Sequence, residues 1–324
     1  MNSFDLLRLL AAASVLYFHV YPLTGRPIPT LFSTNYGELG VAVFFVVSGY
    51  LVTASWRRSA GLGDYLKKRL LRIEPALIVS LVVTALILGA FATTLPLIDY
   101  FRAPQVWLYI LRNALLYPVT YDLPGVFATN PFPHAVNGSL WTLRLEFSCY
   151  LAVALLGLCR VLTPKVVTWL AVLAAIAFVF LRLLRPDLLA QDAFRLIDLA
   201  ALNGFLFLGG AWLQLRDRPP PRWLVVVSIP LLVTPLWLLG LPAVVIAVGS
   251  LRSRKLPADI SYGLYIYAFP LQQILAAAGW LNVWTALAAT TPFAIASWFL
   301  VEKPALRLKS RSAEPLATHL ASER

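Results

Sequence analysis

Long stretches without charge constrain the fold of this chain more than any other feature. Residues 39–56 contain no Asp, Glu, Lys or Arg, and similar apolar runs recur along the 324-residue sequence. Runs of this length match the roughly 17–25 residues that an α-helix needs to cross a bilayer. Backbone groups in lipid must bond internally, and the runs are continuous and not alternating, which excludes the pattern of a β-barrel. The sequence therefore predicts an all-α, polytopic integral membrane protein.

The composition agrees with this class and bears on the partners. The chain is 60% hydrophobic and 13% charged, with a formal net charge of +12. The basic residues lie between the apolar runs and do not gather in a soluble domain, so the charge indicates membrane topology and no nucleic-acid partner. We expect membrane lipid as a partner, and the sequence leaves the oligomeric state open.

About ten spans are expected, with both termini in the cytoplasm. This orientation places most of the 27 Lys and Arg residues in inside loops. The run 103–120 is interpreted as an interfacial or re-entrant segment, within an outer loop at 98–139 that could cap an outward-facing site. The expected spans are 5–22, 38–55, 75–97, 140–159, 165–183, 194–214, 223–239, 240–252, 260–280 and 283–301.

One transmembrane domain is expected at 1–309, followed by a flexible cytoplasmic tail at 310–324, because the sequence after Lys309 is polar. The first apolar run lacks a small-residue cleavage site and is interpreted as a retained helix. Cys149 and Cys159 fall on one expected helix about 15 Å apart, too far for a disulfide.

His19 is the leading candidate for chemistry. It lies eleven residues after Arg8 on the first expected helix, or roughly 16 Å along the axis, about half of the ~30 Å hydrocarbon thickness. An ionisable group at that depth tends to mark a site, although a histidine that is hydrogen-bonded inside a helix bundle would look the same. A general base needs a partner that orients it. The positions one turn earlier, Val15 and Leu16, cannot serve, so the partner must come from another helix.

Glu146 is the leading candidate for this partner. It lies six residues into an expected span that enters from outside, which suggests a depth similar to that of His19. Asp198 is a weaker alternative. Glu146 could instead pair with Arg144 or Arg195, and the sequence does not decide between these roles.

A second candidate site is cytoplasmic. The segment 64–75 reads as an amphipathic helix that leads into the third span, and Arg69 and Arg72 share one face at i, i+3. Two guanidinium groups on one face suit a phosphate or pyrophosphate, and Arg8 could join them. The alternative is positive charge that contacts anionic lipid.

Six short segments carry a resemblance to a known family. They are Phe4-Asp5-x-x-Arg8 with His19, the segment 40–51 with Ser48, the segment 69–75, Ser139-Leu140-Trp141-Thr142 with Glu146 and Tyr150, Ser261-Tyr262-Gly263-Leu264-Tyr265, and Glu302-Lys303-Pro304.

In this order the segments resemble the motifs of membrane acyltransferase family 3, the integral-membrane O-acyltransferases of bacterial glycans. The resemblance covers nearly the whole chain. One departure is Tyr267-Ala268-Phe269-Pro270, where members often carry Trp-His before the proline. A histidine at that place is therefore not essential to chemistry in this chain.

The resemblance implies transfer of an acyl group, by default acetyl, from acetyl-coenzyme A to a hydroxyl of a cell-surface or lipid-linked glycan at the bacterial inner membrane. We expect His19 to act as the general base, with Glu146 orienting it or binding the acceptor. Arg8, Arg69 and Arg72 would bind the donor. No metal is expected. The hydroxyls that could line the donor path or stabilise the oxyanion, or simply bond between helices, are those of Ser48, Tyr262 and Tyr265.

Two alternatives stay open. A transporter or flippase of a glycolipid would also place ionisable groups at the midplane, although inverted repeats and broken helices are not evident. An O-acyltransferase could also act on a small hydroxylated metabolite such as a macrolide.

Overall fold

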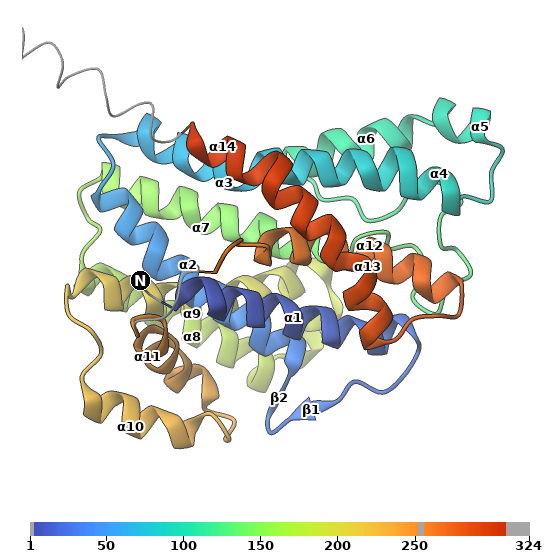
Figure 1. Ribbon diagram of the computed structural model, residues 1–324. Coiled ribbons are helices and arrows are strands. Elements are labelled where there is room, and N and C mark those ends of the chain that lie inside the picture. The colour runs from blue at the N-terminus through green and yellow to red at the C-terminus, as the bar shows by residue number, and fades with distance from the viewer. Residues whose placement is uncertain (1–2, 252–255, 309–324) are drawn as a thin grey trace, which may run out of the picture. The chain divides into compact units, whose positions relative to one another are not determined.

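The computed structural model describes residues 3–251 and 256–308 and is almost entirely helical, which confirms the all-α class (Figure 1). The expected tail at 310–324 lies outside the described residues. The chain divides into two compact units: Met1–Ser59 with Trp141–Pro257, and Ala60–Leu140 with Ala258–Arg324. Both units are assembled from segments that are distant in the sequence.

The first unit contains most of the long helices and the only strands in the described part of the chain. Asn35 is the N-cap of α2, because its side chain accepts a hydrogen bond of 2.9 Å from the Glu38 N–H. The elements are α1 (Phe4–Leu23), β1 (Thr30–Leu31), β2 (Thr34–Asn35), α2 (Tyr36–Arg57), α7 (Leu140–Leu158), α8 (Pro164–Val179), η2 (Phe180–Leu184), η3 (Pro186–Ala190), α9 (Asp192–Leu215), α10 (Arg222–Leu231) and α11 (Trp237–Gly249).

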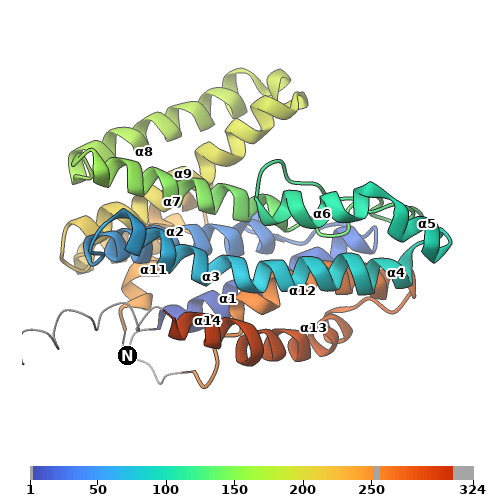
Figure 2. The ribbon, with the colours of Figure 1, turned by 90° about the horizontal axis from the view of Figure 1, so that it is seen from above.

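The second unit is built around α3, on which α6, α12 and α14 pack. Figure 2 shows α3 continuing toward α4. The elements are α3 (Leu62–Val82), η1 (Val83–Leu88), α4 (Gly89–Ala92), α5 (Leu97–Arg102), α6 (Pro104–Ala114), α12 (Ser261–Ala277), α13 (Val283–Ser297), η4 (Trp298–Glu302) and α14 (Lys303–Arg307).

Seven helices among the described residues are long and apolar enough to cross a membrane, fewer than the ten spans expected. Five expected spans, at 5–22, 38–55, 140–159, 165–183 and 194–214, fall on α1, α2, α7, α8 and α9. The other two helices are Leu62–Ala92 and Val283–Arg307, both longer than expected. The chain is a multi-pass membrane protein.

The expected spans 223–239 and 240–252 differ from the structure. They correspond to α10 and α11, which have 10 and 13 residues and are each shorter than a span. α10 ends at Leu231, because Pro235 disfavours helix in the residue before it, and the Thr234 hydroxyl donates to the Leu231 carbonyl at 2.8 Å. The expected span 260–280 corresponds to α12, whose 17 residues are at the lower limit of the length that crosses a bilayer.

The third helix begins earlier than the apolar run. The amphipathic segment and the expected span 75–97 form one continuous helix from Leu62, with Pro75 inside it. The run 103–120 contains only the 11 residues of α6, too short to span a bilayer. This agrees with its interpretation as an interfacial segment.

The outward face of α8 shows which surface meets lipid. Of its 16 residues only Val167 is buried, and large apolar side chains such as Trp169, Leu173 and Ile176 are exposed. Its inner face packs on α9, and Figure 2 shows the two helices side by side. In water this surface would favour aggregation, whereas in hydrocarbon it is the expected exterior.

The crossing of α2 and α9 depends on glycine. A Cβ added at Gly210 would overlap the carbonyl oxygen of Val46, and one added at Gly49 would overlap the carbonyl oxygen of Phe207. Small residues at a crossing let two backbones approach closely, which is the usual way that membrane helices associate.

We therefore expect Gly210→Ala to destabilise the protein by about 1–3 kcal/mol, because the two helices must separate to admit the methyl group. The measurement is the melting temperature of the purified protein in detergent, followed by tryptophan fluorescence. Gly204→Ala is the matched control on the same helix, since a Cβ there meets nothing within 4 Å. It should leave stability equal or raise it by roughly 0.5–1 kcal/mol. Equal melting of the two variants would contradict the close approach.

Candidate functional site

His19 lies near the C-terminal end of α1, in the first unit. Its ring meets that of Phe18 edge to face, with centroids 5.3 Å apart. The Nδ1 atom is buried, and the residue as a whole is half-buried. Phe18 in turn packs on Gly37, where an added Cβ would lie 2.5 Å from the Phe18 ring. The imidazole is thus held by packing at the end of the α1–α2 pair that carries the β1–β2 hairpin, which Figure 1 shows.

Glu146 on α7 accepts hydrogen bonds from two hydroxyls. Ser48 on α2 donates to Oε1, and Tyr150 donates to the same oxygen at 2.6 Å. Tyr150 lies one turn after Glu146, so both side chains share a face of α7. The structure therefore brings two of the expected site residues, Ser48 and Glu146, into one polar cluster, which we call the Glu146 cluster (Ser48, Glu146 and Tyr150).

The depth of Glu146 differs from the expectation. Gly40 of α2 lies at the level of Ala11 on α1, since an added Cβ would be 2.7 Å from the Ala11 carbonyl oxygen. Ser48 lies eight residues further along α2, toward the start of α1, whereas His19 lies eight residues beyond Ala11 in the opposite direction. Along the helix axes the two side chains are roughly 20 Å apart. Glu146, bound to Ser48, is therefore not placed to orient His19 by a direct hydrogen bond.

Asp198, the weaker alternative, is paired elsewhere. Its side chain is 5% exposed and accepts three hydrogen bonds from the Arg182 guanidinium, at 2.8 to 3.1 Å. This two-pronged geometry is the strong form of the Arg–carboxylate pair. The ion pair between Arg182 and Asp198 joins η2, at the end of α8, to α9. Asp198 therefore has a structural role.

Arg72 lies in an ionic network within the second unit. Its guanidinium is 2.7 Å from Asp259 Oδ2 and 3.8 Å from Glu302 Oε2. Ser261 and Ser297 donate to the same two carboxylates, at 2.6 and 3.1 Å. The Glu302 side chain is only 2% exposed. Arg72 therefore links α3 to the segments on either side of α12 and α13, and two carboxylates already compensate its charge.

Arg69 and Arg8 occupy partly buried positions on α3 and α1. Arg69 is three residues before Arg72, so the two share a face of α3 as the spacing predicted.

Tyr262 and Tyr265 are buried, and each donates its hydroxyl to a backbone carbonyl. The acceptors are Ile73 at 3.1 Å and Ser139 at 3.2 Å, both in the second unit. These bonds tie α12 to α3 and to Ser139 in the loop that follows α6, so they favour structural bonding within the unit, a reading that the sequence left open.

Two participants were absent from the sequence-based site. Tyr150 could have been found from its i, i+4 spacing to Glu146 on one helix. Asp259 could not, because its pairing with Arg72 joins residues 187 positions apart. Among residues 3–251 and 256–308, no group of three His, Cys, Asp or Glu side chains is placed to hold a metal ion. Both cysteines are free.

Comparison with known proteins connects this geometry to an activity. A family model described as an acyltransferase domain matches residues 1–253. An O-acetyl transferase of Shigella phage Sf6 is 31% identical, over 98% of this chain and 98% of its own length. Nodulation protein 10 of Rhizobium leguminosarum bv. viciae is 28% identical, over 95% and 94%. No solved structure matches the chain.

Proposed function

Because the chain belongs to the acyltransferase family and is an O-acyltransferase, we propose that it moves an acetyl group from cytoplasmic acetyl-coenzyme A to a hydroxyl of a cell-surface or lipid-linked glycan. The membrane would be the bacterial inner membrane, with both termini in the cytoplasm. The observation that carries the proposal is the similarity to the phage O-acetyl transferase along nearly the whole chain.

His19 is proposed as the general base. The acceptor oxygen attacks the thioester carbonyl carbon while His19 takes the hydroxyl proton. Collapse of the tetrahedral intermediate breaks the carbon–sulfur bond, and the leaving thiolate of coenzyme A takes the proton from His19, which restores the base. The products are an acetyl ester and free coenzyme A. The position of this half-buried histidine on a helix long enough to span the membrane supports this role.

The Glu146 cluster is proposed to line the path of the donor or to bind the acceptor. A carboxylate that already accepts from two hydroxyls is fixed in orientation and can accept further hydrogen bonds from amide or hydroxyl groups. Arg8 and Arg69 are proposed to bind the donor phosphates, because guanidinium groups suit phosphate oxygens. Arg72 is proposed to bind the donor phosphates together with Arg8 and Arg69, and it would do so while it remains paired with Asp259 and Glu302.

The test uses purified protein in detergent with acetyl-coenzyme A and lipid-linked oligosaccharide. Release of free thiol that depends on the oligosaccharide, together with acetate ester on the glycan, is the expected result. A flippase would move the lipid in vesicles and release no thiol. Thiol release with a macrolide but not with the oligosaccharide would instead identify a small metabolite as the acceptor.

A further inference from the structure

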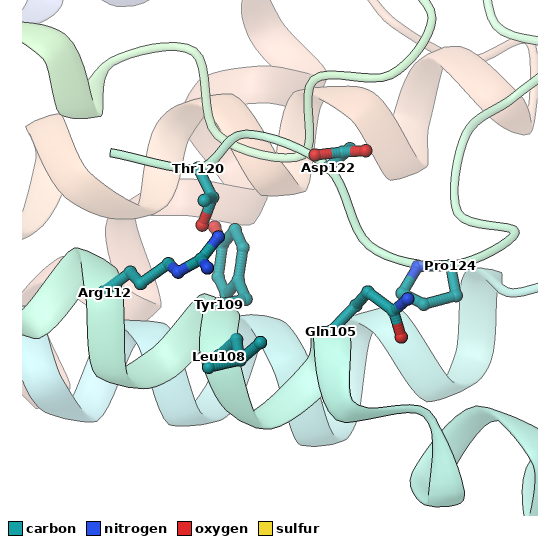
Figure 3. A pocket seen from close by; sticks show the side chains of 7 residues that line it. All are labelled: Gln105, Leu108, Tyr109, Arg112, Thr120, Asp122 and Pro124. Atoms are coloured by element: carbon teal, nitrogen blue, oxygen red, sulfur yellow. The ribbon is translucent and has the colours of Figure 1, made fainter. Parts of the chain in front are cut away.

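A pocket of about 340 Å³ lies in the second unit, between α6 and the segment 120–124 (Figure 3). This volume is within the range of small-molecule sites. One wall is a stripe of α6 at i, i+3, i+4 and i+7, formed by Gln105, Leu108, Tyr109 and Arg112. None of these residues belongs to the site described above.

The other wall is held in place by hydrogen bonds. The buried Asn113 side chain donates to the Thr120 carbonyl at 2.9 Å and accepts from the Thr120 N–H at 3.0 Å. Further along, Thr93 donates to the Pro124 carbonyl at 2.8 Å, and the Val136 N–H donates to the Tyr121 carbonyl at 2.6 Å. The pocket is therefore preformed, as binding sites usually are.

Three polar side chains at the pocket are not used within the described chain. The side chains of Gln105, Arg112 and Asp122 make no hydrogen bond or ion pair with any residue of the described ranges. Arg112 and Asp122 arise from facing walls, and Figure 3 shows the carboxylate apart from the guanidinium. The Tyr109 hydroxyl is buried without a hydrogen-bond partner, and its side chain is 1% exposed. Such a group costs stability until something bonds to it.

The charges at the pocket point to the class of ligand. One cation and one anion leave the lining formally neutral, which disfavours a phosphate or another polyanion. A carboxylate, a guanidinium, an amide and two hydroxyls together offer donors and acceptors that suit an uncharged polyol. Burial raises the pKa of Tyr109, so its hydroxyl remains a donor at physiological pH.

The setting of α6 adds a second constraint. Trp107, Leu111 and Leu115 are exposed on the face of α6 opposite its buried residues, and the pocket stripe lies between these two faces. An amphipathic helix with an apolar face that carries Trp is typical of the membrane interface. A ligand of this pocket would therefore have its polar part at the membrane surface.

We propose that this pocket binds a saccharide and is the acceptor subsite of the transferase. The assignment of the pocket as the acceptor subsite rests on the proposed function, whereas the binding of a saccharide does not. The sugar hydroxyls would donate to Asp122 and accept from Arg112, with Gln105 and Tyr109 completing the contacts.

The test uses methyl glycosides of glucose, galactose, rhamnose and N-acetylglucosamine as probes. Binding to the full chain in detergent is measured by saturation-transfer NMR without donor, and kinetics are measured with acetyl-coenzyme A. We expect Asp122→Asn and Arg112→Gln each to weaken binding of the best glycoside and raise its KM about tenfold or more. The KM for acetyl-coenzyme A should not rise in parallel.

Matched controls are Asp99→Asn and Arg102→Gln on the neighbouring α5, since both residues are exposed and lie outside the pocket. Absence of binding by every glycoside, or equal losses in pocket and control variants, would overturn the proposal. If glycosides bind through the pocket but the wild-type protein releases no thiol, the subsite stands and the proposed transfer fails. If thiol release occurs and the pocket variants keep the wild-type KM, the transfer stands and the subsite fails.

Discussion

Replacement of His19 by Asn is expected to lower acetyl transfer by about 10²- to 10⁴-fold, the usual contribution of a general base. The amide keeps a polar group of similar size on α1 but cannot take a proton from the acceptor hydroxyl. The protein should still fold, because the residue is half-buried and Asn is smaller than His. The measurement is the rate of thiol release at saturating acetyl-coenzyme A, compared with the melting temperature of the same preparation.

His134→Asn is the matched control. His134 is exposed in the loop between α6 and α7, and its φ of 60° is one that Asn tolerates well. It should transfer acetyl at the wild-type rate. A His19→Asn protein with normal melting and more than a tenth of wild-type activity would remove His19 from the proton transfer. In that case the Glu146 cluster would be the remaining candidate for a base in the first unit.

The sequence predicted the helices best where apolar runs end in clear breaks. Five expected spans coincide with α1, α2, α7, α8 and α9 to within a few residues. The expected bounds differ from the structure at α10 and α11, because the break in this apolar run lies near Pro235 and not at 239–240. Hydropathy alone does not locate such a break, since the residues on both sides of it are apolar.

The sequence predicted where single candidate residues lie along their helices, but not how the folded chain groups them. The position of Glu146 along its own helix was correct, yet its partner is Ser48 and its level is far from His19. Depth counted from the end of a span assumes that all helices begin at the same level. The axial offset between helices is instead set by packing, such as that of Gly40 on Ala11, which involves residues distant in the sequence.

Variants of Arg72 can show most clearly whether a residue of the candidate site stabilises the fold or binds the donor. We expect Arg72→Gln to lower the free energy of unfolding by about 3–5 kcal/mol, because the substitution removes a cation that faces the buried Glu302 carboxylate. The measurement is the melting temperature in detergent. Lys68→Gln is the matched control, since Lys68 on the same helix pairs with Asp64 at 2.6 Å but both side chains are about a quarter exposed. A pair of that kind contributes at most about 1 kcal/mol.

The second readout is the KM for acetyl-coenzyme A. If Arg72 acts mainly through Asp259 and Glu302, the double variant Arg72→Gln with Glu302→Gln should recover part of the lost stability, because the buried charge is then removed. If Arg72 mainly grips phosphate, Arg72→Gln should raise the KM while melting stays at the wild-type temperature. Arg69→Gln provides the comparison. If donor phosphates bind this face of α3, this variant should raise the KM for acetyl-coenzyme A, whichever role Arg72 has. A large loss of stability in Arg72→Gln beside a raised KM in Arg69→Gln would divide the two arginines between folding and binding.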